Sequence, residues 1–186
     1  MLELYQNKYR IPSHRLRGWD YSNNGCYFIT IVTAERQMLF GDIREGKMVL
    51  NEMGQIVQNE FFKSFEIREE LFLGAFVLMP DHLHAVIILD NMKKVPEIQQ
   101  HTGDKTLHRP PKSISSFVAG FKSATVQSID DWIDTSGSSM KKFNQNNPLW
   151  QANYHDHIIR NENEYRAIVE YIDQNPAKWD ADNVHQ

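Results

Sequence analysis

The 186-residue chain has a single cysteine, Cys26, so an intrachain disulfide is excluded. Proteins without disulfides are typical of reducing compartments, and Cys26 is expected to be a small core residue. No apolar run approaches the roughly 18 residues that span a bilayer. The N-terminus also lacks the unbroken apolar core of a signal peptide. These absences predict a cytoplasmic protein with no membrane partner.

The chain also lacks a strong net charge, which is −4 at pH 7. This value alone argues mildly against a nucleic-acid partner. The basic residues are segregated, however: residues 8–17 and 105–122 carry several Lys and Arg and no acid. Such segregation can attract a polyanion although the total is negative. Solvated surface loops would have the same pattern, and charge alone does not separate the two.

Hydrophobic residues make up 41% of the chain and charged residues 24%, as in ordinary globular proteins. The length suits one domain. We expect a single domain over residues 1–186, with a basic N-terminal arm at 1–20 and a catalytic core at 21–180.

Hydrophobic periodicity predicts the order strand, hairpin, helix, two strands, helix, strand and helix, at residues 24–36, 38–50, 51–65, 71–90, 113–130, 149–160 and 161–176. Asn51 and Ser113 are the expected N-caps of two helices, and Asn175-Pro176 is expected to end the last helix. Residues 91–112 and 131–147 are expected to be long connections. This order predicts an α+β fold, a ferredoxin-like antiparallel sheet with helices packed on one face.

Two histidines, His82 and His84, interrupt an apolar strand that follows Met79-Pro80-Asp81. Residues i and i+2 of a strand share a face, so both rings project side by side. Two such imidazoles can bind one divalent metal, and we favour this over two hydrogen-bonded histidines at a strand end. A second pair, His155 and His157, is a rival metal site. Its polar surroundings also suit a hydrogen bond to a carboxylate or a phosphate.

Tyr171 and Asn175 lie one helical turn apart, on a face that the apolar stripe of the last helix does not include. A tyrosine can be a covalent nucleophile, but a phenol with an ordinary pKa of about 10 needs activation by a metal, a base or nearby cations. The amide oxygen of Asn175 could be a third metal ligand. A surface tyrosine followed by an asparagine near a helix end has the same pattern, and composition alone favours that simpler interpretation.

Five segments of the chain occur in the order found in the single-tyrosine transposases of the His-hydrophobic-His endonuclease class: RLRGWDYSNNGCYFITIVT, VLMPDHLHAVI, FVAGFKSA, WQANYHDHIIRNENEY and YIDQNPAKW. Over nearly its whole length the chain resembles the REP-associated tyrosine transposases. The resemblance implies that Tyr171 is the nucleophile. It also implies that His82, His84 and Asn175 bind a divalent metal, Mg²⁺ or Mn²⁺. Asp81 departs from the family's pattern, which often has Asn there.

What the resemblance implies is a metal-dependent endonuclease and strand transferase that acts on single-stranded DNA. In this family the tyrosine forms a 5′-phosphotyrosine and releases a 3′-hydroxyl, next to a small imperfect hairpin that the protein recognises. The partner is then single-stranded or hairpin DNA, and a monomer is favoured over a homodimer. The residues expected to contact DNA are Arg10, Arg15, Arg17, Lys112, Lys122, Arg160 and Lys178.

Two other functions are compatible with the same residues. One is a catalytically silent regulator that keeps the fold and binds hairpin DNA. The other is a metal hydrolase that uses one of the two histidine pairs without a covalent tyrosine.

Overall fold

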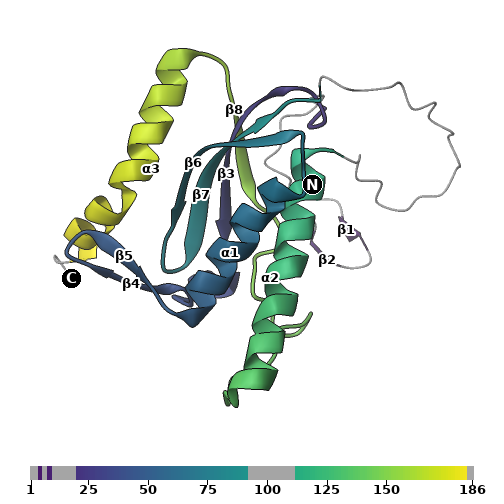
Figure 1. Ribbon diagram of the computed structural model, residues 1–186, viewed down its shortest axis with the longest axis vertical. Helices are drawn as coiled ribbons and strands as arrows, with labels where there is room; N and C mark the ends of the chain where they lie inside the picture. The colour runs from purple at the N-terminus through teal and green to yellow at the C-terminus, as the bar shows by residue number, and fades with distance from the viewer. Residues whose placement is uncertain (1–3, 6–7, 10–19, 92–111, 184–186) are drawn as a thin grey trace, which may run out of the picture.

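Figure 1 shows the computed structural model, which describes residues 4–5, 8–9, 20–91 and 112–183. Its centre is a four-stranded antiparallel sheet in the order β6-β7-β3-β8. The strands of this sheet are β3 (Gly25–Val32), β6 (Leu71–Leu78), β7 (His82–Leu89) and β8 (His155–Ile159). Two smaller sheets pair β1 (Leu4–Tyr5) with β2 (Lys8–Tyr9), and β4 (Gly41–Arg44) with β5 (Lys47–Leu50).

Three helices pack on the four-stranded sheet, namely α1 (Glu52–Glu66), α2 (Ile114–Ser136) and α3 (Glu162–Asn183). In Figure 1, α1 and α2 lie on one side of the sheet and α3 lies on the other. The predicted α+β fold with an antiparallel sheet is therefore confirmed.

The two faces of the sheet bury different side chains, because alternate residues of a strand point to opposite faces. Tyr27 and Ile29 of β3 belong to the large core that also contains Phe61 of α1. Phe28, between them, packs in a smaller cluster with Ile172 of α3. The central strands are apolar on both faces, so helices cover both. The expectation of helices on one face only is wrong.

Helices α1 and α2 begin at the predicted caps. The Asn51 side chain accepts a hydrogen bond from the backbone N–H of Gly54 at 2.9 Å, and Ser113 forms a reciprocal capping box with the third residue of α2. These bonds satisfy N–H groups that have no partner within the helix.

Helix α2 runs to Ser136 and ends at Gly137, whose φ of 70° is left-handed. The predicted connection at 131–147 is therefore wrong for residues 131–136. Ile133 in this stretch is buried in the large core, which extends the apolar stripe of α2 by more than a turn.

Helix α3 continues through Pro176 to Asn183, so the prediction that Asn175-Pro176 ends the helix is wrong. A proline inside a helix removes one backbone hydrogen bond and crowds the carbonyl four residues earlier. The β4–β5 hairpin supports the helix beyond this point: a Cβ at Gly46 would lie 3.4 Å from Cα of Ala177. Packing against the hairpin thus outweighs the local cost of the proline.

The strand predicted at 149–160 is limited to β8. Trp150 lies outside β8 and instead forms an isolated β-bridge with Thr33, the residue that follows the end of β3. Most of the predicted connection at 91–112 lies outside the described residues. In the described part of the chain, no helix is both long and apolar enough to cross a membrane.

Candidate active site

The turn between β6 and β7 sets the position of the histidine pair. Its backbone is closed by a hydrogen bond from Met79 N–H to the His82 carbonyl at 2.7 Å. The neighbouring segment holds the turn from outside: Thr33 N–H donates to the Asp81 carbonyl at 2.8 Å, and Leu39 N–H donates to the Pro80 carbonyl at 2.9 Å. The start of β7 is therefore fixed by main-chain bonds on both sides.

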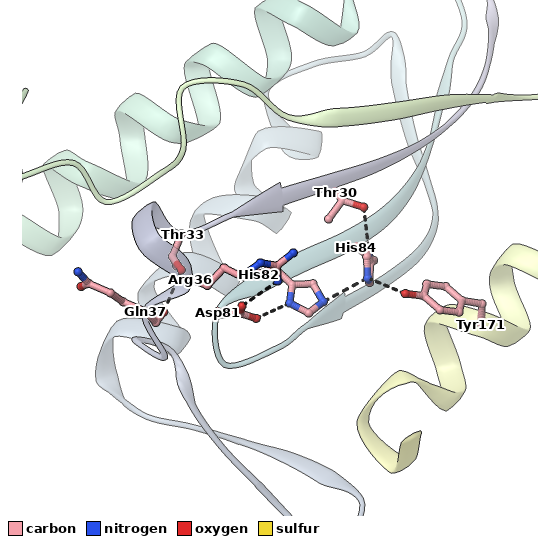
Figure 2. Close-up of polar contacts among 8 residues, drawn as sticks. All are labelled: Thr30, Thr33, Arg36, Gln37, Asp81, His82, His84 and Tyr171. Carbon is pink, nitrogen blue, oxygen red and sulfur yellow. Dashed lines mark hydrogen bonds and ion pairs between the residues drawn. The ribbon is translucent and has the colours of Figure 1, made fainter. Parts of the chain in front are cut away.

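His82 and His84 project side by side from β7, as predicted from their spacing, and they lie on the face that α3 covers. Both side chains are buried, and their Nε2 atoms lie 3.2 Å apart. Figure 2 shows the two rings between Asp81 on one side and Tyr171 on the other.

Each ring has an outer partner on its Nδ1 atom. Nδ1 of His82 lies 2.5 Å from Oδ1 of Asp81, and Nδ1 of His84 lies 2.8 Å from Oγ1 of Thr30. A carboxylate only accepts hydrogen bonds, so Nδ1 of His82 carries a proton, and Nε2 keeps a lone pair in the tautomer where that is the only ring proton. The Thr30 hydroxyl can accept from Nδ1 of His84 in the same way. In that arrangement two nitrogen lone pairs face one point between the rings.

The electrostatic surroundings favour this state. Burial, together with the neighbouring His82, lowers the pKa of His84 to about 3, so its ring is neutral at physiological pH. Burial alone would raise the pKa of Asp81, but its hydrogen bond to His82 and the nearby Arg36 guanidinium outweigh burial and lower it. Asp81 is therefore a carboxylate at neutral pH.

Tyr171 of α3 contacts the histidine pair, and Asn175 of the same helix lines the pocket beside it. The Tyr171 hydroxyl lies 3.2 Å from Nε2 of His84, and the side chain stays 41% exposed. Asn175, one turn further along, is buried. An open pocket of about 230 Å³ is lined by His82, Tyr171, Asn175, Lys178 and Trp179. The structure thus brings together the residues that the sequence predicts to be the nucleophile and the metal ligands.

The nitrogens of the pair are suitably placed for a shared metal. Bonds of about 2.0–2.1 Å to two imidazole nitrogens at octahedral or tetrahedral angles put those nitrogens about 2.8–3.4 Å apart, and the observed separation is 3.2 Å. In the part of the chain that the structure describes, no group of three His, Cys, Asp or Glu could hold a metal. The remaining ligands would be the Asn175 amide oxygen and water, a mixed N/O set.

The rival pair has a different setting. Nε2 of His157 lies 2.6 Å from one carboxylate oxygen of Glu164, whose other oxygen accepts from the Arg160 backbone N–H at 2.7 Å. The Arg160 N–H and the His157 hydrogen bond together lower the pKa of Glu164. A hydrogen bond to a carboxylate is one of the alternatives that the sequence analysis gives for this pair. The contact links β8 to the first turn of α3. His155 shares the sheet face of His84, with Thr30 of β3 between them.

Of the residues expected to contact DNA, the four that the structure describes do not gather in one place. Lys178 lines the pocket, but Nζ of Lys122 donates to the backbone carbonyls of Gln151 and Asn153 at 2.7 and 3.2 Å. Lys112 and Arg160 lie near the opposite end of the sheet, roughly 17 Å along the strands from the histidines at 3.4 Å per residue. The remaining three, Arg10, Arg15 and Arg17, lie outside the described residues.

Three residues of the site had no clear signal in the sequence. Thr30 can be found only through the strand register that places it opposite His84. Arg36 reaches Asp81 at 3.2 Å from a turn 45 residues earlier. Trp179 lies beyond the proline that was expected to end α3, and its ring centroid is 5.7 Å from that of His82.

This chain resembles a known protein in sequence and a solved structure in fold. A protein of Haemophilus influenzae, described as uncharacterized, is 32% identical over 177 residues, which cover 93% of this chain and 92% of that protein. A solved structure of a REP-associated tyrosine transposase bound to a REP hairpin is similar with a TM-score of 0.55 and 23% identity, covering 90% of this chain and 74% of that one. No family model matches the sequence.

Proposed function

Because this chain belongs to the family of the Haemophilus influenzae protein and has the fold of a REP-associated tyrosine transposase, we propose that it cuts and rejoins single-stranded DNA. In this proposal it is a metal-dependent endonuclease and strand transferase, and Tyr171 is its covalent nucleophile. The Haemophilus relative carries no described activity, so the proposal rests on the site and the fold.

The observation that carries the proposal is the contact between Tyr171 and the histidine pair. The phenol oxygen lies 3.2 Å from Nε2 of His84, although the two residues are 87 positions apart in the chain. The tyrosine remains partly exposed at the pocket, where a substrate could reach it. A tyrosine beside a pair of potential metal ligands is one arrangement that can activate a phenol for attack on a phosphodiester.

In the proposed reaction the oxygen of Tyr171 attacks the phosphorus of a phosphodiester. A bond between phosphorus and the tyrosine oxygen forms, and the bond from phosphorus to the 3′-oxygen of the preceding nucleotide breaks. The phenol loses its proton and the departing oxygen gains one, which leaves a 5′-phosphotyrosine and a 3′-hydroxyl. The phosphodiester energy is retained in the tyrosine link, so a 3′-hydroxyl can reverse the step and rejoin the strand.

His82, His84 and Asn175 would hold the divalent metal, Mg²⁺ or Mn²⁺, whose chemistry when bound is to polarise the phosphate and neutralise developing charge. Lys178 at the rim of the pocket would contact a phosphate oxygen. The solved transposase is bound to a REP hairpin, and we propose a hairpin beside a single strand as the substrate here also. The monomeric state and the cytoplasmic location remain predictions.

The test is a cleavage assay on hairpin oligonucleotides taken from the flanks of the protein's own gene, with Mn²⁺ or Mg²⁺. A label at the 3′ end should move with the protein on a denaturing gel, and a label at the 5′ end should appear in a free, shorter strand. Tyr171→Phe and His82→Ala should abolish both products. Tyr165→Phe, a matched change on the same helix, should retain them.

The outcomes separate the three functions. Hairpin binding without an adduct under either metal would favour the catalytically silent regulator. Cutting that survives in Tyr171→Phe would favour a metal hydrolase. An adduct that depends on Tyr171 and on the metal would establish the transferase.

A further inference from the structure

The carboxylate of Asp81 lies between two partners and is almost completely buried. Its side chain is 3% exposed, Oδ1 faces Nδ1 of His82 at 2.5 Å, and Oδ2 faces Arg36 at 3.2 Å. Figure 2 shows the resulting chain of contacts from Arg36 through Asp81 and His82 to His84. A buried carboxylate in such a chain can influence the site without touching a substrate.

We propose that Asp81 and Arg36 are positioning residues of this site. Asp81 holds His82 in the tautomer whose Nε2 lone pair faces His84, and Arg36 offsets the negative charge that Asp81 would otherwise present to a phosphate. The consequences for metal and DNA rest on the proposed function, whereas the tautomer is a property of this chain alone.

The tautomer of His82 is set by the chemistry of the Asp81 carboxylate. A carboxylate accepts and never donates, so only the Nδ1–H form of His82 satisfies the contact. An asparagine could turn its amide to donate to Nδ1 instead, and would then permit either tautomer. The partner of His84 is the Thr30 hydroxyl, which can donate or accept and therefore imposes no such choice. Asp81 is thus the group that fixes the tautomer of His82.

The backbone around Arg36 supports a specific role for its side chain. Arg36 ends the short 3₁₀ helix η1 (Ala34–Arg36), and both Glu35 and Arg36 have a φ of 53°. Left-handed conformations are uncommon for such residues and persist where the surroundings hold them. Here the Thr33 hydroxyl closes the turn onto the Gln37 carbonyl at 2.9 Å, as Figure 2 shows. The turn delivers the guanidinium to Asp81.

The charge of Asp81 matters because the proposed substrate is an anion. A phosphate that approaches the histidines would meet the negative charge of Asp81 one residue away, and like charges at such distances repel. The Arg36 side chain is 67% exposed, so it can offset that charge from the solvent side without being buried itself. If the ion pair only stabilised the turn, loss of either residue would change stability but not the His82 tautomer, the Mn²⁺ affinity or the hairpin affinity of the folded protein.

The first test is nuclear magnetic resonance of ¹⁵N-histidine-labelled protein at about pH 8 with no metal added. Long-range proton–nitrogen spectra distinguish a protonated from an unprotonated ring nitrogen. Wild type should show His82 protonated at Nδ1 only, and Asp81→Asn should show a mixture or the other tautomer. An unchanged Nδ1–H form in a folded Asp81→Asn variant would overturn the proposal. Asp81→Ala gives a second reading if the asparagine variant unfolds.

The second test measures Mn²⁺ binding by water-proton relaxation. Asp81→Asn should raise the Kd for Mn²⁺ about 10- to 100-fold, which is the usual effect of losing the hydrogen-bond partner of a metal-bound histidine. Arg36→Gln should leave the Mn²⁺ Kd within about twofold of wild type, yet weaken hairpin binding about fivefold in the presence of a chelator. Equal loss of Mn²⁺ affinity in both variants would overturn the charge-offset role of Arg36.

The chain offers a matched control in another Arg–Asp pair. Arg44 and Asp42 lie 3.5 Å apart on the β4–β5 hairpin, and both are exposed. Asp42→Asn and Arg44→Gln should leave the His82 tautomer and both affinities unchanged. If wild type binds no divalent metal at all, the proposed function fails, while the tautomer experiment still decides whether Asp81 positions His82.

Discussion

Two lysines that the sequence treats alike have different surroundings. Nζ of Lys122 donates to the Gln151 carbonyl at 2.7 Å and to two further carbonyls of the segment that leads to β8. Hydrogen bonds from a charged group contribute about 1.5–3 kcal/mol. We expect Lys122→Met to lower the free energy of unfolding by about that amount in urea titrations. The folded variant should bind hairpin DNA like wild type, and weaker binding at full folding would contradict this assignment.

Lys178 should behave in the opposite way. It is exposed at the pocket and contributes to its lining. Lys178→Ala should change the free energy of unfolding by less than about 0.5 kcal/mol. It should weaken hairpin binding at low salt and reduce the slope of log affinity against log salt by about one, as expected for one lost phosphate contact. A salt slope identical to that of wild type would remove Lys178 from the interface.

Helix α1 packs so close to the backbone at Phe40 that it requires a glycine at position 54. A Cβ at Gly54 would lie 2.1 Å from the carbonyl oxygen of Phe40, a main-chain atom that cannot turn away. Helix propensity favours alanine over glycine by about 1 kcal/mol, but overpacking a close contact costs typically about 1–3 kcal/mol or more. We expect Gly54→Ala to lower the thermal midpoint in circular dichroism, because steric overlap outweighs propensity.

Gly120 on α2 supplies the control for this prediction. It is exposed, and the nearest atom to an added Cβ is the guanidinium end of Arg68 at 2.9 Å. A flexible side chain can move, so Gly120→Ala should be neutral or slightly stabilising. If Gly54→Ala is as stable as Gly120→Ala, the backbone at Phe40 can shift at little cost and the predicted steric overlap is wrong.

Helix α3 explains why element boundaries were harder to predict than elements. Asn175-Pro176 has the local signature of a helix end, yet the helix continues because the β4–β5 hairpin packs against its last turns. Those turns carry Lys178 and Trp179 into the pocket. No local pattern reports a contact with a hairpin that lies more than a hundred residues earlier. The continuation of the helix beyond Pro176, and with it the place of Trp179, was therefore not predictable, although Lys178 was expected to contact DNA.

For the whole molecule, the order of strands and helices and the antiparallel sheet followed from hydrophobic periodicity and helix caps. The meeting of His82, His84, Tyr171 and Asn175 followed from strand and helix spacing together with the family resemblance. What could not be predicted depends on the register between strands and on turn conformation. The burial of Asp81 under Arg36 is the main example, because it requires a left-handed turn with no glycine in it.

A bound metal would join the sheet to α3, since its proposed ligands come from both. A ligand that binds only the folded state adds about 2.7 kcal/mol at a concentration of 100 times its Kd. For a chain of this length that amounts to a rise of roughly 5–10 °C in Tm. We expect this rise with Mn²⁺ in differential scanning fluorimetry, reversed by a chelator and absent in His84→Ala. His157→Ala, which alters the rival pair, should keep the full rise. If instead His157→Ala loses the rise and His84→Ala keeps it, the metal is bound by β8, and the arrangement of Tyr171 beside His84 needs another explanation.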